Sequence, residues 1–164
     1  MERVLVSACL LGDPVRYDGA AATADHPVLR RWRGEGRIVS CCPEVAAGLP
    51  IPRACVELER AGALSLLEGR ARALAQDGGD VTEAFLVGAR LALDTCRDLG
   101  IHVAVLKERS PSCGTGLIYD GTFTGSLVPG QGVATALLRQ HGIAVFAEHQ
   151  WEEADRRLAE REGR

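Results

Sequence analysis

The chain has 164 residues, of which 46% are hydrophobic and 25% are charged, and its formal net charge is -3 at pH 7. This length and composition suit one globular domain, spanning residues 1–164, and exclude a disordered chain. The weakly acidic balance provides no broad basic field, so we expect a small-molecule partner and no nucleic acid polymer.

The beginning of the chain, MERVLVSACLLGD, has one basic residue and a short apolar run that leads directly into turn residues. It therefore differs from a signal peptide, and no segment approaches the roughly 20 apolar residues of a membrane span. We expect no membrane association and a reducing, cytoplasmic setting. There the six cysteines would act as ligands, nucleophiles or buried small residues rather than as disulfides.

The first third of the chain predicts two strands joined by a short helix. Residues 3–8 (RVLVSA) are β-branched and apolar and predict a buried strand, which ends at Cys9. Asp25 and Pro27 suit the start of a helix that the glycines at 34 and 36 stop. Residues 37–41 predict the second strand, which must end before Pro43 because proline cannot donate a ladder hydrogen bond.

The rest of the chain continues the alternation of strands and helices. Glycines interrupt residues 54–79, which favours a small hairpin excursion, and Asp80 with Glu83 resembles a capping pair for a helix that ends at Gly100. Residues 102–106 predict a third strand, followed by a polar loop over residues 107–116 that contains Cys113. Residues 132–140 predict a helix, residues 143–147 a fourth strand, and the charged C-terminus a last helix.

This alternation predicts a single-domain α/β fold: a mainly parallel, Rossmann-like sheet flanked by helices, with the excursion at residues 54–79 beside it. In such sheets the ligand crevice lies outside the carboxyl ends of the strands. Cys9, Cys42 and Cys113 each follow a predicted strand within a polar loop. We therefore expect the topology to bring these three thiols together.

The other cysteines fit a packing role better. Cys96 falls within the amphipathic helix, and Cys55 has no polar loop chemistry around it. Cys41 and Cys42 cannot point the same way in a strand, and Cys42, next to Pro43, is the better ligand. Three thiolates are compatible with zinc, but the paired Cys-x-x-Cys spacing is absent. An iron-sulfur cluster with three protein ligands would keep one iron open for a substrate atom.

Several polar residues in the same loops are candidates for catalysis. Glu44 suits a general acid or base, because a desolvated site moves a carboxyl pKa toward neutrality, although a charge at a helix N-terminus is an equal alternative. The hydroxyls of Ser110 and Ser112 can donate to a substrate, with a plain turn as the competing interpretation.

Candidate substrate-binding residues follow the first, second and third predicted strands. A substrate phosphate or carbonyl would suit basic side chains, although such residues usually coat the surface. The triplet Tyr-Asp-Gly at residues 17–19 recurs at 119–121, although Asp-Gly is also a common turn. We take as candidates Arg16, Tyr17, Asp18, Arg53 and Lys107.

Four motifs together carry a family resemblance: VSACLLGDPVRYDG, CPEVAAGLPIPR, GGDVTEAFLVGA and LKERSPSCGTGLIYDGTFTG. They resemble a family of short bacterial proteins, once described only as a domain of unknown function, whose characterised members are thiouracil desulfidases. The resemblance runs from about Val4 to Phe146. It departs from the family at Ala54 and Cys55, where another proline is expected, and this puts substrate choice in doubt.

The resemblance implies a 4Fe-4S cluster held by Cys9, Cys42 and Cys113, with Glu44 and Ser110 at catalytic positions. The implied activity converts a thiolated pyrimidine, such as 2-thiouracil, 4-thiouracil or their nucleosides and nucleotides, to the oxo base and hydrogen sulfide. Two alternatives remain at this point, namely an iron-sulfur redox or iron sensor and a zinc-dependent hydrolase with the same three thiolates.

Overall fold

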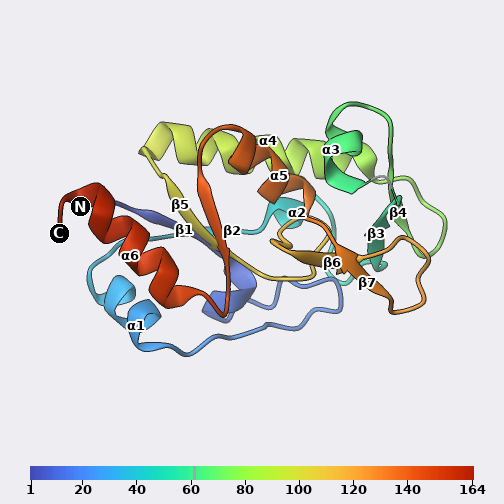
Figure 1. The fold of residues 1–164 in the computed structure, drawn as a ribbon. Helices are drawn as coiled ribbons and strands as arrows, with labels where there is room; N and C mark the ends of the chain where they lie inside the picture. The colour runs from blue at the N-terminus through green and yellow to red at the C-terminus, as the bar shows by residue number, and fades with distance from the viewer. Residues whose placement is uncertain (61) are drawn as a thin grey trace.

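The computed structural model describes residues 1–60 and 62–164, and its centre is a parallel four-stranded sheet (Figure 1). The strand order is β2-β1-β5-β8, and all three neighbouring pairs are parallel. The strands are β1 (Val4–Ser7), β2 (Ile38–Cys41), β5 (Val103–Leu106) and β8 (Ala144–Ala147). The predicted α/β class and the four predicted strands are confirmed.

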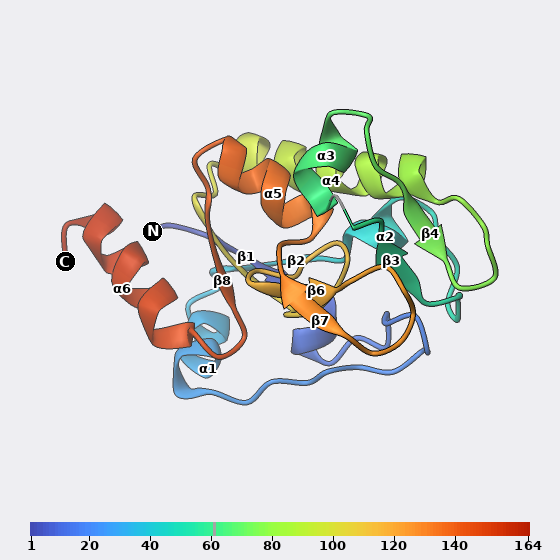
Figure 2. The same cartoon turned by 45° about the vertical axis from the view of Figure 1, so that its right-hand side comes forward.

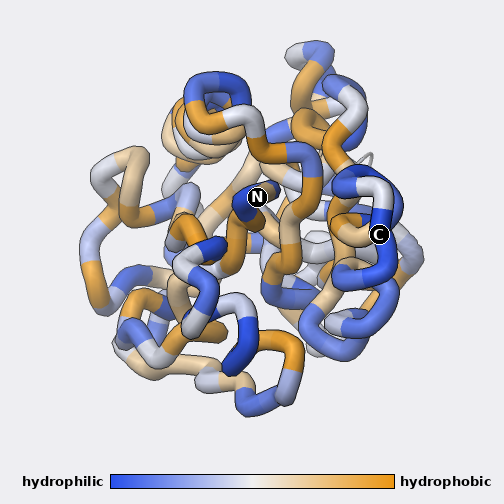
Figure 3. The backbone as a smooth tube through the Cα atoms, turned by 90° about the vertical axis from the view of Figure 1, so that its left-hand side faces the viewer, coloured by the Kyte–Doolittle hydropathy of each residue, from blue (hydrophilic) through white to orange (hydrophobic). Residues whose placement is uncertain are grey.

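Helices cover both faces of this sheet (Figure 2). Side chains alternate along a strand, so Val4 and Val6 of β1 pack with Trp32 and Trp151, whereas Leu5 packs on the opposite face. The two helices on the first face are α1 (Pro27–Gly34) and α6 (Trp151–Glu162), and those on the second are α4 (Thr82–Leu99) and α5 (Val133–Gln140). Hydrophobic segments run through the middle of the molecule, while the chain near the C-terminus is largely hydrophilic (Figure 3).

The helix ends differ slightly from the sequence prediction. The pair of Asp80 and Glu83 does not form a capping box; instead the Asp80 carboxylate accepts the Thr82 N–H at 3.0 Å, and α4 begins at Thr82. Gly100 closes α4 in a left-handed conformation (φ +64°), as predicted. None of the helices in the described residues is both long and apolar enough to cross a membrane.

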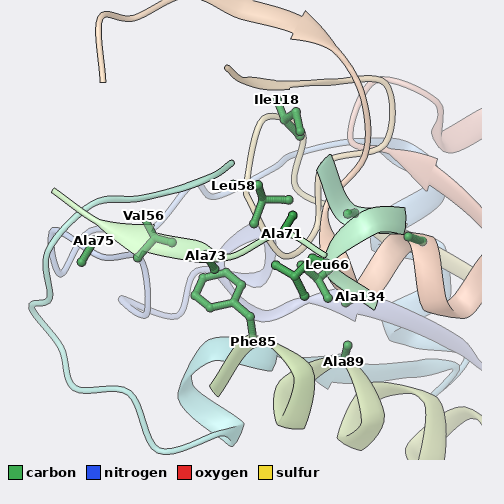
Figure 4. Packing of buried hydrophobic residues seen from close by; sticks show 13 residues of the cluster. Val56, Leu58, Leu66, Ala71, Ala73, Ala75, Phe85, Ala89, Ile118 and Ala134 are labelled. Atoms are coloured by element: carbon green, nitrogen blue, oxygen red, sulfur yellow. The ribbon is translucent and has the colours of Figure 1, made fainter. Parts of the chain in front are cut away.

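Two small hairpins lie beyond the carboxyl ends of the sheet strands (Figure 1). The first pairs β3 (Val56–Leu58) with β4 (Ala73–Ala75), with α3 (Gly62–Leu67) between them, which matches the predicted excursion. The second pairs β6 (Leu117–Tyr119) with β7 (Leu127–Pro129) and was not predicted. Leu58, Leu66 and Ile118 pack with Phe85 of α4, which anchors the hairpins to the main body (Figure 4).

Candidate functional site

A cavity of about 460 Å³ lies at the carboxyl edge of the sheet, and Cys9, Cys42 and Cys113 all line it. The cavity is bounded by the loops after β1, β2 and β5 on one side and by the two hairpins on the other. The expectation that parallel topology gathers these three cysteines is therefore met by the geometry.

Adjacent strands position the first two thiols. Ser7 and Cys41 are register partners at the ends of β1 and β2, so Cys9 and Cys42 follow side by side. Cys9 sits in the short 3₁₀ turn η1 (Ala8–Leu11), and its carbonyl accepts the Ala22 N–H at 3.0 Å. Cys42 caps the short helix α2 (Pro43–Ala46), and its carbonyl accepts the Ala46 N–H at 2.9 Å.

The loop after β5 holds the third thiol rigidly. The Cys113 N–H donates to Ser110 Oγ at 3.1 Å, and the Cys113 carbonyl accepts the Thr135 hydroxyl at 2.9 Å. Gly132 precedes α5, and a Cβ added there would lie 2.3 Å from the carbonyl carbon of Ser112. Only glycine lets the start of α5 approach this loop so closely, which buries Cys113.

Glu108 fixes the backbone of the same loop. Its Oε1 accepts the N–H groups of Thr115 at 2.7 Å and Gly116 at 3.1 Å, and its Oε2 accepts the Thr115 hydroxyl at 2.6 Å. Burial opposes the charge, but these hydrogen bonds outweigh it and lower the pKa of Glu108 to about 2. The ionised carboxylate of Glu108 therefore stabilises the loop that contains Cys113 through these hydrogen bonds.

The protein environment keeps the free thiols protonated at neutral pH. Burial, partly offset by the charge of Lys107, raises the pKa of the Cys9 thiol to about 11, and burial together with Cys41 and Glu44 raises that of Cys113. Binding of a metal would thus displace their protons. Across residues 1–60 and 62–164, no three Cys, His, Asp or Glu side chains lie so as to share a single metal ion. In a cluster each thiolate binds a different iron, so thiols spread around one cavity fit that donor geometry.

Glu44 is a carboxylate that lines the cavity with the three thiols and is held by two other side chains. Arg53 Nε lies 3.1 Å from Glu44 Oε1, and the Ser112 hydroxyl donates to Glu44 Oε2 at 3.0 Å. The other guanidinium nitrogens of Arg53 donate to the carbonyls of Pro50 at 3.1 Å and Val15 at 3.0 Å. The structure thus makes Arg53, a predicted substrate ligand, the partner that orients Glu44.

The two candidate serines have different surroundings. Ser112 is buried and is absent from the cavity lining, and its hydroxyl donates a hydrogen bond to Glu44. Ser110 lines the cavity, and its oxygen accepts the N–H groups of Ser112 and Cys113, each at 3.1 Å. Its proton therefore has no acceptor among these contacts and is free to point into the cavity.

The remaining predicted substrate ligands are distributed unevenly. Arg16, Tyr17 and Lys107 line the cavity, and the Lys107 ammonium also donates to Glu148 Oε1 at 2.8 Å. Arg16 lies against the Tyr17 ring, 6.0 Å from its centroid. Asp18 is outside the cavity lining, and its carboxylate accepts the Ala20 N–H at 2.9 Å within a turn.

Sequence reasoning missed most of the hairpin wall. The lining residues of the hairpins that were not taken as candidates include Cys55, Glu57, Gln76, Tyr119 and Phe123, and Cys41 at the end of β2 also lines the cavity. The sequence offers no polar loop chemistry around Cys55, yet Glu57 lies two residues further on. The recurrence of Tyr-Asp-Gly at residues 119–121 was the available signal for Tyr119. A lone carboxylate inside the apolar strand β3 was the signal for Glu57.

Comparisons with known proteins agree with this geometry. The model of a family described as 2-thiouracil desulfurase matches residues 4–150. An uncharacterised protein of Bacillus subtilis (strain 168), YbbK, is 38% identical over 147 residues, which cover 90% of this chain and 96% of that protein. The solved structure of TudS, described as a [4Fe-4S]-dependent thiouracil desulfidase, superimposes with a TM-score of 0.87 at 47% identity, covering 97% of this chain and 99% of that one.

Proposed function

Since the chain belongs to the 2-thiouracil desulfurase family, we propose that it removes sulfur from thiolated pyrimidines, giving the oxo base and hydrogen sulfide. Candidate substrates are 2-thiouracil, 4-thiouracil and their nucleosides or nucleotides. One observation carries the proposal: three separated thiols and an oriented carboxylate, Glu44, line one cavity. The overall exchange, in which C=S and water become C=O and hydrogen sulfide, needs no external electron donor or acceptor.

A 4Fe-4S cluster would be held by Cys9, Cys42 and Cys113, because soft thiolates are its usual protein ligands and all three face the same cavity. When bound, a cluster with three protein ligands supplies one open iron, a Lewis acid suited to the thiocarbonyl sulfur. Every other step falls to side chains of this chain. A reducing compartment such as the cytoplasm suits the six free cysteines.

Glu44 would act as the general base. Its carboxylate is held from one side by Arg53 and from the other by Ser112, so it takes a proton from the attacking water at a fixed position. The same carboxyl would then return that proton to the departing sulfur. Ser110 would donate its free hydroxyl proton to the substrate or the water, a role that depends on position rather than on an unusual pKa.

The test is anaerobic reconstitution with iron and sulfide, followed by incubation with 2-thiouracil, 4-thiouracil and the corresponding nucleosides and nucleotides. We expect brown protein with broad visible absorbance, stoichiometric release of hydrogen sulfide, and formation of the oxo base. Ser110→Ala should lower kcat per bound cluster, with iron content measured alongside because Ser110 also accepts the Cys113 N–H, and Ser112→Ala should act by loosening Glu44.

Two results would count against this function. Protein that binds zinc and stays colourless after reconstitution would point to hydrolysis at a single metal ion. Protein that carries a cluster but releases no sulfide from any thiolated pyrimidine would point to a sensing role for the same three cysteines.

A further inference from the structure

Glu57 is a buried carboxylate on the wall of the cavity that the mechanism above does not use. It is the middle residue of β3, it is only 6% exposed, and it lines the same cavity as the three thiols and Glu44. After burial, the negative charges of Glu57 and Glu44 raise the pKa of the Cys55 thiol. Cys55 and both carboxylates therefore belong to the lining of one cavity.

One carboxylate oxygen of Glu57 accepts hydrogen bonds from the protein backbone. Oε1 accepts the backbone N–H of Gly121 at 2.9 Å and that of Phe123 at 3.2 Å. Within residues 1–60 and 62–164, no Lys, Arg or His side chain forms an ion pair with this carboxylate, and no donor reaches Oε2. Glu2 Oε2 is the one buried side-chain oxygen without a partner in that part of the chain, so Glu57 Oε2 keeps accessible surface. Because Glu57 lines the cavity, we assign this free oxygen to the cavity wall.

The loop held by Glu57 brings an aromatic ring to the same wall. Phe123 has φ +58°, in the left-handed region that bulky residues avoid, and it lines the cavity. Gly121 has φ +92°, and a Cβ added there would lie 2.6 Å from the Leu58 carbonyl. The loop is therefore packed against β3 in a strained conformation, and its backbone contact with Glu57 makes Phe123 and Glu57 neighbours in the cavity lining.

A purely structural role does not require a charge at this position. An amide oxygen would accept the same two N–H groups, and burying a carboxylate without a cation costs free energy that a neutral side chain avoids. The charge and the free oxygen are explained if a ligand supplies a hydrogen-bond donor. Aromatic rings with an adjacent acceptor are suited to a planar heterocycle that bears an N–H group.

We propose that Glu57 selects the base by accepting the hydrogen of the pyrimidine N3–H through Oε2, with Phe123 against the ring face. This inference rests on the proposed function and names the specificity residue of that site. In uracil-type bases N3 lies between C2 and C4, the two carbons that carry oxygen or sulfur. The N3–H is therefore adjacent to the thiocarbonyl in both 2-thiouracil and 4-thiouracil, so one carboxylate serves either isomer.

Glu57→Gln tests the proposal because it should reverse the preference between bases rather than only weaken binding. The N–H groups of Gly121 and Phe123 will keep the amide oxygen at the position of Oε1, which turns the NH₂ group toward the cavity. The position of Oε2 then changes from acceptor to donor. It should reject N3–H and accept a base whose N3 carries a lone pair, such as cytosine.

The measurement is calorimetric binding of uracil, 1-methyluracil, 3-methyluracil and 1-methylcytosine to the reconstituted protein, with no turnover involved. The parent should bind uracil and 1-methyluracil alike and 3-methyluracil about ten- to a hundredfold more weakly, as expected for one lost hydrogen bond to a charged group. In Glu57→Gln that difference should vanish, and 1-methylcytosine should bind more tightly than it does to the parent. Glu59→Gln, which alters a partly exposed carboxylate that is paired with Arg72 and is absent from the cavity lining, should leave the preferences unchanged.

Equal weakening of all four ligands in Glu57→Gln, with a lower Tm, would show that Glu57 only holds the loop and would overturn the proposal. So would unchanged discrimination between 1-methyluracil and 3-methyluracil. These results are distinguishable from failure of the proposed function, because sulfide release from thiouracil by the parent is measured separately. If the parent binds 1-methyluracil more tightly than 3-methyluracil but releases no sulfide from thiouracil, the binding role of Glu57 is supported and the proposed reaction is rejected.

Discussion

The two ends of the central sheet use buried charge in opposite ways. At the amino end, Arg37 is 6% exposed and its guanidinium pairs with Glu162, at 2.5 Å, and with Glu35, which ties the two termini together (Figure 1). The hydrogen bond from Arg37 is the main cause that lowers the pKa of Glu162 to about 2. At the carboxyl end, Arg53 and Ser112 hold Glu44, two backbone N–H groups hold Oε1 of Glu57, and both carboxylates line a cavity.

We therefore assign the buried charges at the amino end to protein stability and those at the carboxyl end to the proposed reaction. At the amino end Arg37 and Glu162 are paired with each other, so we assign these side chains to the stability of the folded state. At the carboxyl end both carboxylates line the cavity with the three thiols, and Glu57 keeps an oxygen without a donor, an arrangement that costs stability and favours chemistry. Substitutions at the carboxyl end should therefore change activity, whereas those at the amino end should change stability alone.

The largest effect is expected at the carboxyl end from Cys113→Ala. Loss of one of three proposed cluster ligands should abolish detectable sulfide release and reduce iron bound per chain, because metal affinity depends on the full ligand set. Iron analysis and sulfide assay test this. Cys96→Ala on α4 is the matched control. It should retain iron while losing about 1–2 kcal/mol of stability, and a drop in iron for both variants would contradict the ligand assignment.

Glu44→Gln should reduce kcat by about 10²- to 10⁴-fold, the usual contribution of a general base, and should also lower Tm, because Arg53 stays buried without its charged partner. Glu162→Gln at the amino end should lower Tm for the same reason, since Arg37 loses its partner, but should leave kcat unchanged. The pair is measured by steady-state kinetics and thermal unfolding. Similar kinetic losses in both variants would remove the contrast between the two ends.

Gly88→Ala should damage the site indirectly. A Cβ at Gly88 on α4 would lie 2.4 Å from the Pro43 carbonyl oxygen, so α2 must move and take Cys42 and Glu44 with it. We expect a stability loss of about 1–3 kcal/mol and a reduced kcat. Gly34→Ala, on α1 with no atom within 4 Å, should be neutral or stabilising by up to about 1 kcal/mol. Equal urea midpoints for the two variants would refute the close-approach argument.

The smallest expected effect concerns pH and Glu108. Its pKa is about 2 in the folded protein against an ordinary 4.5, so its stabilisation is complete above pH 4.5 and disappears as the pH falls from 4.5 to 2. The side chain is largely solvated, which limits the contribution to about 1 kcal/mol or less. Urea midpoints of the parent and Glu108→Gln should differ at pH 7 and converge toward pH 3. A constant difference across this range would show that ionisation of Glu108 does not stabilise the fold.

The sequence by itself determined the parallel sheet and the edge at which the chemistry lies. Buried apolar strands and glycine-ended helices are local patterns, and parallel connectivity places every strand end on one edge, so Cys9, Cys42 and Cys113 were predictable as a group. The hairpin at residues 117–129 was missed because its three-residue strands are too short to display a period.

The hydrogen-bond partner of each polar side chain in the cavity was determined only by the tertiary structure. Ser112 reaches Glu44 across 68 positions of sequence, and Glu57 holds Gly121 across 64, contacts for which no local pattern exists. Distinguishing Ser110 from Ser112, or assigning Arg53 to Glu44 rather than to substrate, required knowing where each hydrogen bond goes. Side-chain roles depend on the direction and partner of each donor, and those are fixed only when distant segments pack.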